Sequence, residues 1–337
     1  YTNLTEKNLV LEGLAEGAWD FRVRGICNDV DTSAYAYLNS FVVFYPERHC
    51  VDYVHLKSEN IHGSIGTFKD PYQIVDTIVD FGDEQRSRQT VILDPDMYDP
   101  RTDNQLLMIP DGEWASVRLG NWAVSSQAES LSFDIEVDEE SALLLIKYAV
   151  VLEDPSHDAV AQPRFTLEIL DEYGSSVSTC GEADFTADVN RPGWHSNAKR
   201  TVCWKDWTTL GLNLWDLDLA GQTVTVRFTT YDCSMGGHYG YAYFTLGCAR
   251  ARLTGTSCGN DTIMNIEAPA GFDYAWYNKY GEFVSDQATL AVPPSDTTTY
   301  RCHLSYKEAP DCGFNLYSAN KPRYPYADFT WQWIPSN

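Results

Sequence analysis

Apolar and polar residues alternate along much of this chain. The alternation is clearest over residues 18–25 (AWDFRVRG), 130–137 (SLSFDIEV), 165–170 (FTLEIL) and 223–229 (TVTVRFT). A period of two is typical of strands with one buried face. Residues 143–152 (LLLIKYAVVL) are almost continuously apolar, which predicts a strand buried on both faces. Amphipathic helical windows are nearly absent and turn-forming residues recur at short intervals, so the pattern predicts an all-β protein.

The strand pattern divides the 337 residues into three segments. Residues 49–254 are the longest, and their many short strands without an internal repeat favour a jelly-roll β-sandwich. Residues 1–48 hold too few strands to close a sandwich alone. Residues 255–337 contain a further set of strands and a linker-like tail (KPRYPYADFTWQWIPSN). We therefore expect three modules with these boundaries.

Charge and hydropathy narrow the class of protein. The chain carries 24 basic and 48 acidic residues, a formal charge of −24. This negative charge repels phosphate backbones, so a nucleic-acid partner is not expected. No apolar run approaches the roughly 18 residues that a membrane-spanning helix needs, so the chain is not expected to be membrane-embedded. Because it begins at Tyr1 rather than Met, we expect it to belong to a longer chain with further domains.

The nine cysteines include no C-x-x-C pair, which argues against a zinc ribbon or a thioredoxin-like motif. Widely spaced cysteines on strand-like segments favour disulfide bonds, which persist in oxidising compartments. Nine is an odd number, so at least one thiol is expected to be free or paired outside the chain. The cysteines predict an exported protein, secreted or held at the cell surface.

The stretch LVLEGLAEGAWDFRVRGICNDVDTSAYAYLNSFVV (9–43) resembles the second half of a fibronectin type III domain. The match rests on Leu11, Gly13, Leu14, Gly17, Phe21, Val23, Cys27, Ser33 and Phe41. Trp19 stands where tyrosine is usual in that family. The resemblance implies that residues 1–48 are a partial fibronectin-like module, whose other half is cut away or which docks onto the next module.

Residues 49–254 carry two resemblances. Their ending, DC–GGHYGYAYF–LGC, is similar to the close of MAM-type and galactose-binding-type jelly rolls. The segments NQLLMIPDGEWASVRLGNW, LLIKYAVVLEDPSH, QPRFTLEILDEYG and WKDWTTLGLNL resemble a module of large secreted surface proteins of Bacteroidetes. These families imply a jelly-roll architecture, but no assigned chemistry.

Residues 255–337 resemble an immunoglobulin-like domain. Trp276 lies in the strand-like stretch YAWYNKYG, and Tyr300 and Cys302 form the Y-x-C of a tyrosine corner. The resemblance implies a sandwich around Trp276. Two disulfide pairings stay open, Cys258–Cys302 and Cys302–Cys312.

Residues 229–248 (TTYDCSMGGHYGYAYFTLGC) concentrate more chemistry than any other stretch. Consecutive glycines permit a turn between two strands, so we expect a closing hairpin. A disulfide between Cys233 and Cys248 would staple it, with Cys180 as a rival partner for either. The alternative is an apical loop in which Asp232, His238 and Tyr239 contact a ligand.

Aromatic residues suggest a carbohydrate face on the jelly roll. Sugar rings dock on exposed aromatic faces, and tryptophans cluster over residues 194–215. We predict a ligand-binding set of Trp194, Trp204, Trp207, His238 and Tyr239. WKDWTTL alternates like a strand, so one of Trp204 and Trp207 is expected in the core.

A calcium site is the second candidate. Residues 93–105 (LDPDMYDPRTDNQ) contain Asp94, Asp96, Asp99 and Asp103, and dense carboxylate oxygens suit a hard cation such as Ca²⁺. The stretch lacks the glycine and glutamate of an EF-hand loop. The alternative is an acidic turn in which aspartates cap backbone amides.

Catalytic motifs are scarce. Residues 152–158 (LEDPSHD) place carboxylates beside His157, a combination that binds metals or transfers protons, although a loop between strands explains them as well. The chain contains no GxSxG, HExxH, P-loop or GxGxxG motif. A facing pair among the 48 acids, as in glycosidases, stays an alternative.

Together these features predict a non-enzymatic, exported surface or adhesion fragment whose jelly roll binds a glycan or a cell-surface protein. The alternatives are a pure spacer, in which rigid modules extend a distal domain, and a glycan-degrading enzyme.

Overall fold

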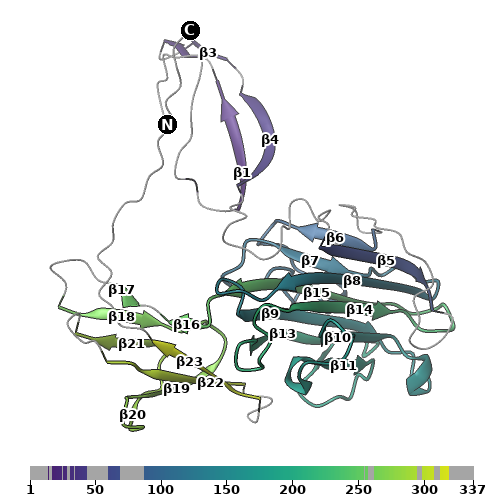
Figure 1. Cartoon of the computed structure of the whole chain (residues 1–337). Coiled ribbons are helices and arrows are strands. Elements are labelled where there is room, and N and C mark those ends of the chain that lie inside the picture. Colours follow the sequence, from purple (N-terminus) through teal and green to yellow (C-terminus); the bar gives the residue numbers. More distant parts are fainter. Residues whose placement is uncertain are drawn as a thin grey trace. The chain divides into compact units, whose positions relative to one another are not determined.

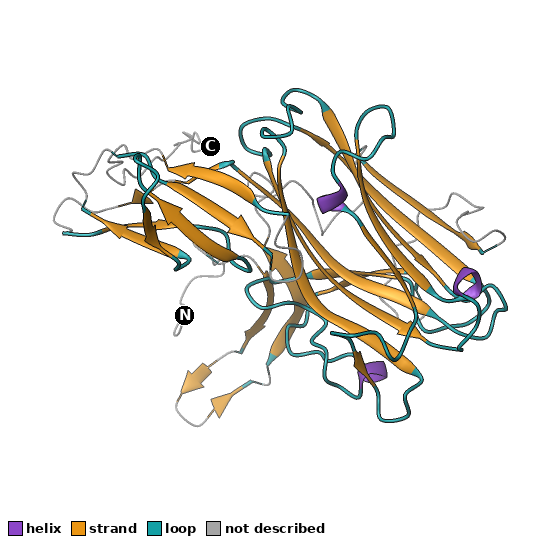
Figure 2. Cartoon of the chain, turned by 90° about the horizontal axis from the view of Figure 1, so that it is seen from below, coloured by secondary structure: helices purple, strands orange, loops and turns teal. Residues whose placement is uncertain are grey.

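A computed structural model of the chain describes residues 14, 17–24, 26–28, 31–33, 35–43, 60–68, 87–253, 255–256, 262–293, 298–306 and 312–318. Its long elements are all β-strands, and the helices described are short 3₁₀ turns (Figure 2). The all-β prediction is confirmed. Within these ranges no helix has the length and apolar character needed to cross a membrane.

The chain forms two compact units. The first contains Tyr1–Ile135, Ile146–Thr208 and Thr223–Gly247, and the second contains Glu136–Leu145, Thr209–Gln222 and Cys248–Asn337. Residues 136–145 and 209–222, which the sequence pattern assigns to the jelly roll, therefore group with the C-terminal residues. The sheets follow the predicted segments 1–48, 49–254 and 255–337 with one exception, because the strand Arg252–Leu253 of the middle segment pairs in a sheet of the C-terminal segment.

Two sheets build the jelly roll (Figure 1). The five-stranded sheet contains, in spatial order, β11 (Ala183–Thr186), β10 (Arg164–Leu170), β14 (Thr223–Tyr231), β8 (Gln127–Glu136) and β5 (Ile61–Thr67). The six-stranded sheet contains β12 (His195–Ser196), β13 (Val202–Asn213), β9 (Leu143–Glu153), β15 (Gly240–Ala249), β7 (Ser116–Leu119) and β6 (Gln89–Ile92). Successive strands such as β8 and β9 lie in different sheets, as jelly-roll connectivity requires.

Aromatic rings join the two sheets in the core. The rings of Phe228 on β14 and Phe244 on β15 stack with centroids 3.9 Å apart, and Phe133 on β8 meets Phe244 edge to face at 5.8 Å. Val224 and Val226 are buried on the same face as Phe228, as the alternation predicts. Burying each such side chain stabilises the fold by roughly 1.5–3 kcal/mol.

The six-stranded sheet is buried on both faces, as the apolar run over β9 predicts. Ala149 and Val151 lie in a second cluster with Trp204, Tyr241 and Tyr243. The segment between β6 and β7 completes this cluster with Leu106, Met108 and Ile109. Residues 93–115 therefore cover the outer face of the sheet.

Residues 229–248 do not form the predicted hairpin, because β14 and β15 belong to different sheets. Residues 232–239 instead cross from one sheet to the other. The buried carboxylate of Asp232 fixes the crossing by accepting hydrogen bonds from the backbone N–H groups of Gln127 (2.8 Å) and Gly240 (3.2 Å). These residues begin β8 and β15, so one side chain ties both sheets together.

The predicted Cys233–Cys248 staple is wrong. Cys233 is a free, buried thiol, whereas Cys248 is disulfide-bonded, as is Cys180. Cys233 lies beside the start of β15, where its N–H bonds to the carbonyl of His238 at 3.0 Å. Cys248 lies eight residues after Gly240 on the same strand, a distance of roughly 26 Å. A disulfide tolerates a Cα separation of only about 7 Å, so Cys248 is too far along the strand to pair with Cys233.

Cys302 is also free, so neither of the pairings considered for it forms. Its side chain is buried in a core cluster with Trp276. The register of its strand places Leu316 opposite it instead of Cys312. Cys312 itself is disulfide-bonded, and Cys258 lies outside the described residues. Disulfide-bonded cysteines such as Cys312 are typical of proteins that fold outside a reducing cytosol.

The C-terminal strands form two sheets of their own. One contains β16 (Arg252–Leu253), β23 (Phe314–Ser318), β22 (Arg301–Ser305), β19 (Asp273–Tyr277) and β20 (Phe283–Ser285). The other contains β17 (Gly255–Thr256), β18 (Met264–Glu267) and β21 (Thr289–Val292). Trp276 on β19 is fully buried and donates its indole N–H to the carbonyl of Gln287 at 2.8 Å.

The N-terminal strands pair separately. β1 (Gly17–Val23) pairs antiparallel with β4 (Ala36–Val43), and β2 (Ile26–Asn28) pairs with β3 (Asp31–Thr32). Leu11 and Gly13, on which the fibronectin resemblance partly rests, lie outside the described residues.

Candidate functional site

A groove of about 650 Å³ lies on the outer face of the five-stranded sheet. All five strands of the sheet contribute to its wall. The lining residues are His62, Ser64, Ser130, Ser132, Arg164, Thr166, Leu167, Glu168, Glu182, Ala183, Asp184, Arg227, Thr229 and Tyr231. Most of them occupy every second strand position, opposite in phase to core residues such as Leu131 and Phe228, because successive side chains point to opposite faces of a sheet.

Two ion pairs cross neighbouring strands in the groove. Arg227 on β14 lies directly opposite Glu168 on β10, and its Nε donates to Glu168 Oε2 at 3.0 Å. Arg164 on β10 donates from Nε to Asp184 Oδ1 at 2.6 Å, and its Nη2 contacts the other carboxylate oxygen. Each pair offers N–H donors beside carboxylate acceptors, an arrangement that can bind two adjacent hydroxyl groups of one ligand.

Hydroxyl groups fill the floor between the charged pairs and β5. Ser130 donates to the carbonyl of Phe228 at 3.2 Å and lies 3.3 Å from the hydroxyl of Thr229. Ser132 donates to the carbonyl of His62 at 3.4 Å. A hydroxyl both donates and accepts, so these side chains keep hydrogen-bonding capacity toward the groove. The wall is polar, with Tyr231 as its aromatic member.

Sequence reasoning missed this groove. The signal was present as polar residues at alternate positions, for example Ser130 and Ser132, and Thr166 and Glu168. Alternation shows that a strand has a polar face, but not which strands are neighbours. The five strands come from residues 61 to 231, so only the sheet order brings their polar faces together.

The predicted aromatic face is wrong for Trp204 and Tyr239, which are 1% and 5% exposed. Both lie beneath residues 93–115, which cover that face of the sheet. Trp207 is partly buried against the same cluster and donates its indole N–H to the carbonyl of Leu107 at 2.8 Å. Trp194 is half-buried, edge to face with the ring of Phe185 at 5.3 Å.

Replacing Trp204 therefore tests whether its side chain belongs to the core. We expect Trp204→Ala to lower the free energy of unfolding by about 3–5 kcal/mol, because it leaves a cavity beneath the covering segment. Trp194→Ala is expected to cost about 1 kcal/mol, since its ring is only half-buried. Urea-induced unfolding measures both values. Equal losses in the two variants would contradict the assignment of Trp204 to the core.

The predicted acidic site contributes to this same covering segment. Asp99 is fully buried, and its Oδ2 accepts hydrogen bonds from the hydroxyls of Tyr241 (2.8 Å) and Tyr243 (2.9 Å). Its Oδ1 accepts from the N–H of Arg101 at 2.7 Å, at the start of the short helix η2 (Pro100–Thr102). Burial raises the pKa of Asp99, and these hydrogen bonds partly oppose the rise.

The other predicted calcium ligands are exposed. Asp94 accepts a hydrogen bond from the N–H of Asp96 at 3.0 Å, and Asp103 accepts from the N–H of Ala198 at 2.7 Å. The first contact matches the acidic-turn alternative, in which carboxylates cap backbone amides of the turn, whereas the second joins the stretch to a distant loop. Calcium binding here stays a prediction.

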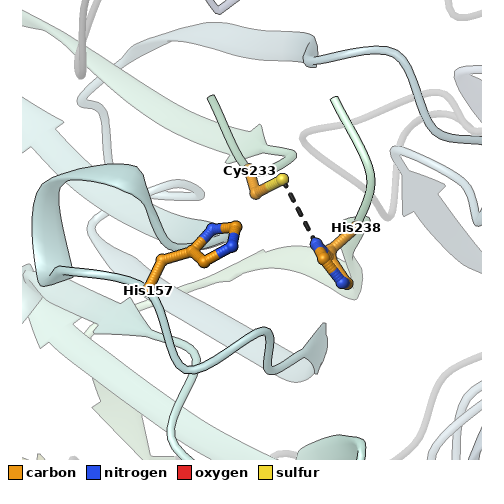
Figure 3. A group of neighbouring side chains, drawn as sticks. All are labelled: His157, Cys233 and His238. Atoms are coloured by element: carbon orange, nitrogen blue, oxygen red, sulfur yellow. Dashed lines mark hydrogen bonds between the residues drawn. The ribbon is translucent and has the colours of Figure 1, made fainter. Parts of the chain in front are cut away.

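His238, the last predicted ligand-contact residue, lies in the crossing between the sheets. The structure brings it together with His157, from the LEDPSHD stretch, and with the free thiol of Cys233 (Figure 3). These residues lie outside the groove lining. The sequence noted both histidines but gave no reason to join them, because 81 positions separate them.

Comparisons with known proteins give only distant likenesses. No protein-family model matches the chain, and no curated protein matches it. Among solved structures, the chain is similar to a carbohydrate-binding module, TmCBM61, in complex with β-1,4-galactotriose, with a TM-score of 0.26, 10% identity, and coverage of 48% of this chain and 82% of that chain. It is also similar to the adhesin domain of Epf from Streptococcus pyogenes, with a TM-score of 0.18, 9% identity, and coverage of 63% and 78%.

A third likeness is to the glycoside hydrolase domain Endo-D from Streptococcus pneumoniae R6, with a TM-score of 0.22 and 11% identity. It covers 61% of this chain and 33% of that chain. All three TM-scores are low, so these likenesses say nothing about what this chain binds.

Proposed function

We propose that the jelly roll is a carbohydrate-binding module of an exported surface protein, and that the groove on its five-stranded sheet holds the glycan. The observation that carries the proposal is the lining of the groove, in which two Arg–carboxylate pairs and a row of serine and threonine hydroxyls face one open space. Oligosaccharides present dense hydroxyl groups that need both donors and acceptors. This lining supplies both.

The charge of the groove favours a neutral sugar. Its lining contains Arg164 and Arg227 against Glu168, Glu182 and Asp184. With neutral histidine, two arginines against three carboxylates give a formal sum of −1, and each arginine is already engaged with a carboxylate. An acidic glycan would have to compete with those carboxylates for the guanidinium groups, whereas vicinal hydroxyls can bridge the existing pairs.

Binding without catalysis is part of the proposal. The carboxylates of Glu168 and Asp184 are ion-paired in the groove. Burial raises the pKa of Glu129 to about 8 and that of Asp232 to about 7. These are the kind of carboxyl groups suited to acid catalysis, but both are buried and neither lines the groove.

A glycan array probed with the labelled full chain tests this function. We expect binding to a defined neutral oligosaccharide. Arg227→Ala is expected to weaken that binding at least about tenfold, because hydrogen bonds to a charged group contribute roughly 1.5–3 kcal/mol. Thr166→Val, which keeps the branched shape and removes one hydroxyl, is expected to weaken it by a smaller factor.

Arg250→Ala is the matched control. Arg250 forms an exposed ion pair with Glu140, neither residue lines the groove, and the loss of Arg250 should leave glycan binding unchanged. All variants should melt at nearly the wild-type temperature, since exposed ion pairs add little stability. If the wild-type chain binds no glycan on the array, the spacer alternative is favoured.

A further inference from the structure

Three metal-ligating side chains meet where the chain crosses between the sheets. His157 comes from the loop after β9, and Cys233 and His238 lie at the two ends of the crossing turn (Figure 3). One ligand atom from each residue lies within 4.8 Å of the other two. No other cluster of this kind occurs among the residues that the structure describes.

We propose that His157, Cys233 and His238 bind a divalent transition-metal ion of the zinc class. One thiolate and two imidazoles suit a borderline-soft ion such as Zn²⁺ and are poor ligands for calcium. Three protein ligands leave a fourth tetrahedral position for water or a ligand from outside.

The separation of the ligand atoms fits such an ion. Cys233 Sγ lies 3.4 Å from Nδ1 of His238. In a tetrahedral site with Zn–S of about 2.3 Å and Zn–N of about 2.0 Å, a sulfur and a nitrogen ligand lie roughly 3.5 Å apart. The two side chains therefore already span one edge of a tetrahedron.

The unpartnered ring nitrogen of His157 also supports a metal site. Its Nδ1 is buried and has no hydrogen-bond partner among the described residues. Buried polar nitrogens without partners are rare in folded proteins, and an ion is one of the few explanations for them. A metal ion bound beside the thiol would explain why this imidazole lacks a hydrogen-bond partner.

The backbone holds the ligands in place without the ion. Gly236, with φ of +77°, turns the chain so that the N–H of Cys233 reaches the carbonyl of His238 at 3.0 Å. The N–H of Gly237 donates to Cys233 Sγ at 3.4 Å. Such an amide contact stabilises a thiolate and orients it toward its metal.

The loop of His157 is anchored independently. Asp154 accepts hydrogen bonds from the N–H groups of Ser156 (2.7 Å) and Val189 (2.9 Å) and from the amide of Gln162 (2.9 Å). Burial acts to raise the pKa of Asp154, but these hydrogen bonds hold it below its ordinary value. The resulting carboxylate adds negative charge beside the cluster, which favours a cation.

Metal binding fits this thiol better than nucleophilic chemistry. Cys233 has no exposed surface, so a macromolecular substrate cannot reach its sulfur. A small ion can approach from the side of His157 and His238, which are both partly exposed. The ion would join the loop after β9 to the crossing, and would thereby stabilise that end of the jelly roll.

Titration of the chelator-treated full chain with Co²⁺ tests the site. We expect the visible d–d absorption of tetrahedral cobalt together with a thiolate-to-cobalt charge-transfer band, and displacement of both by Zn²⁺. Cys233→Ser should remove the charge-transfer band. It should also weaken zinc binding by more than roughly a hundredfold, since even the loss of an outer-shell partner costs 10–100-fold.

Matched controls separate this site from other thiols and from misfolding. Cys302→Ser removes another free, buried thiol and should leave both bands unchanged. His157→Gln should weaken zinc binding while the apoprotein keeps its wild-type melting temperature. Zinc should raise that temperature in the wild type and in Cys302→Ser only. Absence of the charge-transfer band in the wild type, or its equal loss in Cys302→Ser, would overturn the proposal.

Discussion

Replacing Asp99 by alanine is expected to lower the free energy of unfolding by about 3 kcal/mol or more, because it leaves several buried donors unpaired at once. The hydroxyls of Tyr241 and Tyr243 and the N–H of Arg101 all donate to this carboxylate. Both tyrosine rings lie beneath the covering segment with no exposed surface, so water cannot replace the lost acceptor. Urea-induced unfolding measures the loss.

Asp96→Ala is the control, since Asp96 is an exposed acid of the same stretch. It is expected to change stability by no more than about 0.5 kcal/mol. The triple variant Asp99→Ala with Tyr241→Phe and Tyr243→Phe should recover part of the loss, because the unpaired hydroxyls are then absent. Running the series with calcium and with EDTA separates the two roles proposed for the stretch. If Asp99→Ala were costly only with calcium present, a metal-ligand role would replace the structural one.

Stability is expected to fall as pH rises from about 4.5 to about 8, because the buried carboxyl groups of Glu129 and Asp232 both have raised pKa values. Glu129 on β8 is 1% exposed, and its burial raises its pKa from 4.5 to about 8. The charge of Asp232 adds to the rise, whereas Arg88, whose Nε lies 3.3 Å away, and the hydroxyl of Thr230 oppose it. Between these pH values the folded chain keeps a proton that the unfolded chain has released.

Between about pH 4.5 and pH 8 the folded state binds more protons than the unfolded state. The stability that Glu129 contributes is therefore complete below about pH 4.5 and is lost as pH rises through 8. The loss is at most roughly 1.4 kcal/mol per pH unit. Glu129→Gln, which stays neutral, should reduce this slope, leaving the share that Asp232 contributes, and should be more stable than the wild type at alkaline pH. Glu113→Gln removes a carboxylate that pairs with Lys147 at 2.6 Å near the surface, and should leave the slope unchanged. Thermal melting across this pH range gives the slopes. Parallel profiles for the wild type and Glu129→Gln would remove Glu129 from the explanation.

The alternation of apolar and polar residues was enough to predict the strands and their inward faces. Val224, Val226 and Phe228 are buried as expected, and the run over β9 is buried on both faces. These outcomes follow from local geometry, because side-chain direction in a strand depends only on position. Cysteine pairing and sheet membership depend on long-range topology, which the sequence pattern does not contain.

The failed hairpin shows this limit most clearly. Two consecutive strands joined by a glycine-rich turn favour a hairpin on local grounds. The crossing between β14 and β15 satisfies the same turn chemistry while it joins two different sheets. The tryptophans failed for a related reason, because Trp204 lies on a strand face that looks solvent-exposed until residues 93–115 cover it.

The groove has a consequence for how this protein can change over time. Most residues facing the groove alternate along each strand with residues facing the core. In the neighbouring pairs Ser130 and Leu131, and Arg227 and Phe228, the first residue faces the groove and the second faces the core, so substitutions at the two positions disturb different parts of the molecule. A lineage can exchange groove side chains one at a time while the sandwich keeps its melting temperature. If the groove holds a glycan, as we propose, its preference for one glycan or another is free to diverge among close relatives whose cores remain nearly identical.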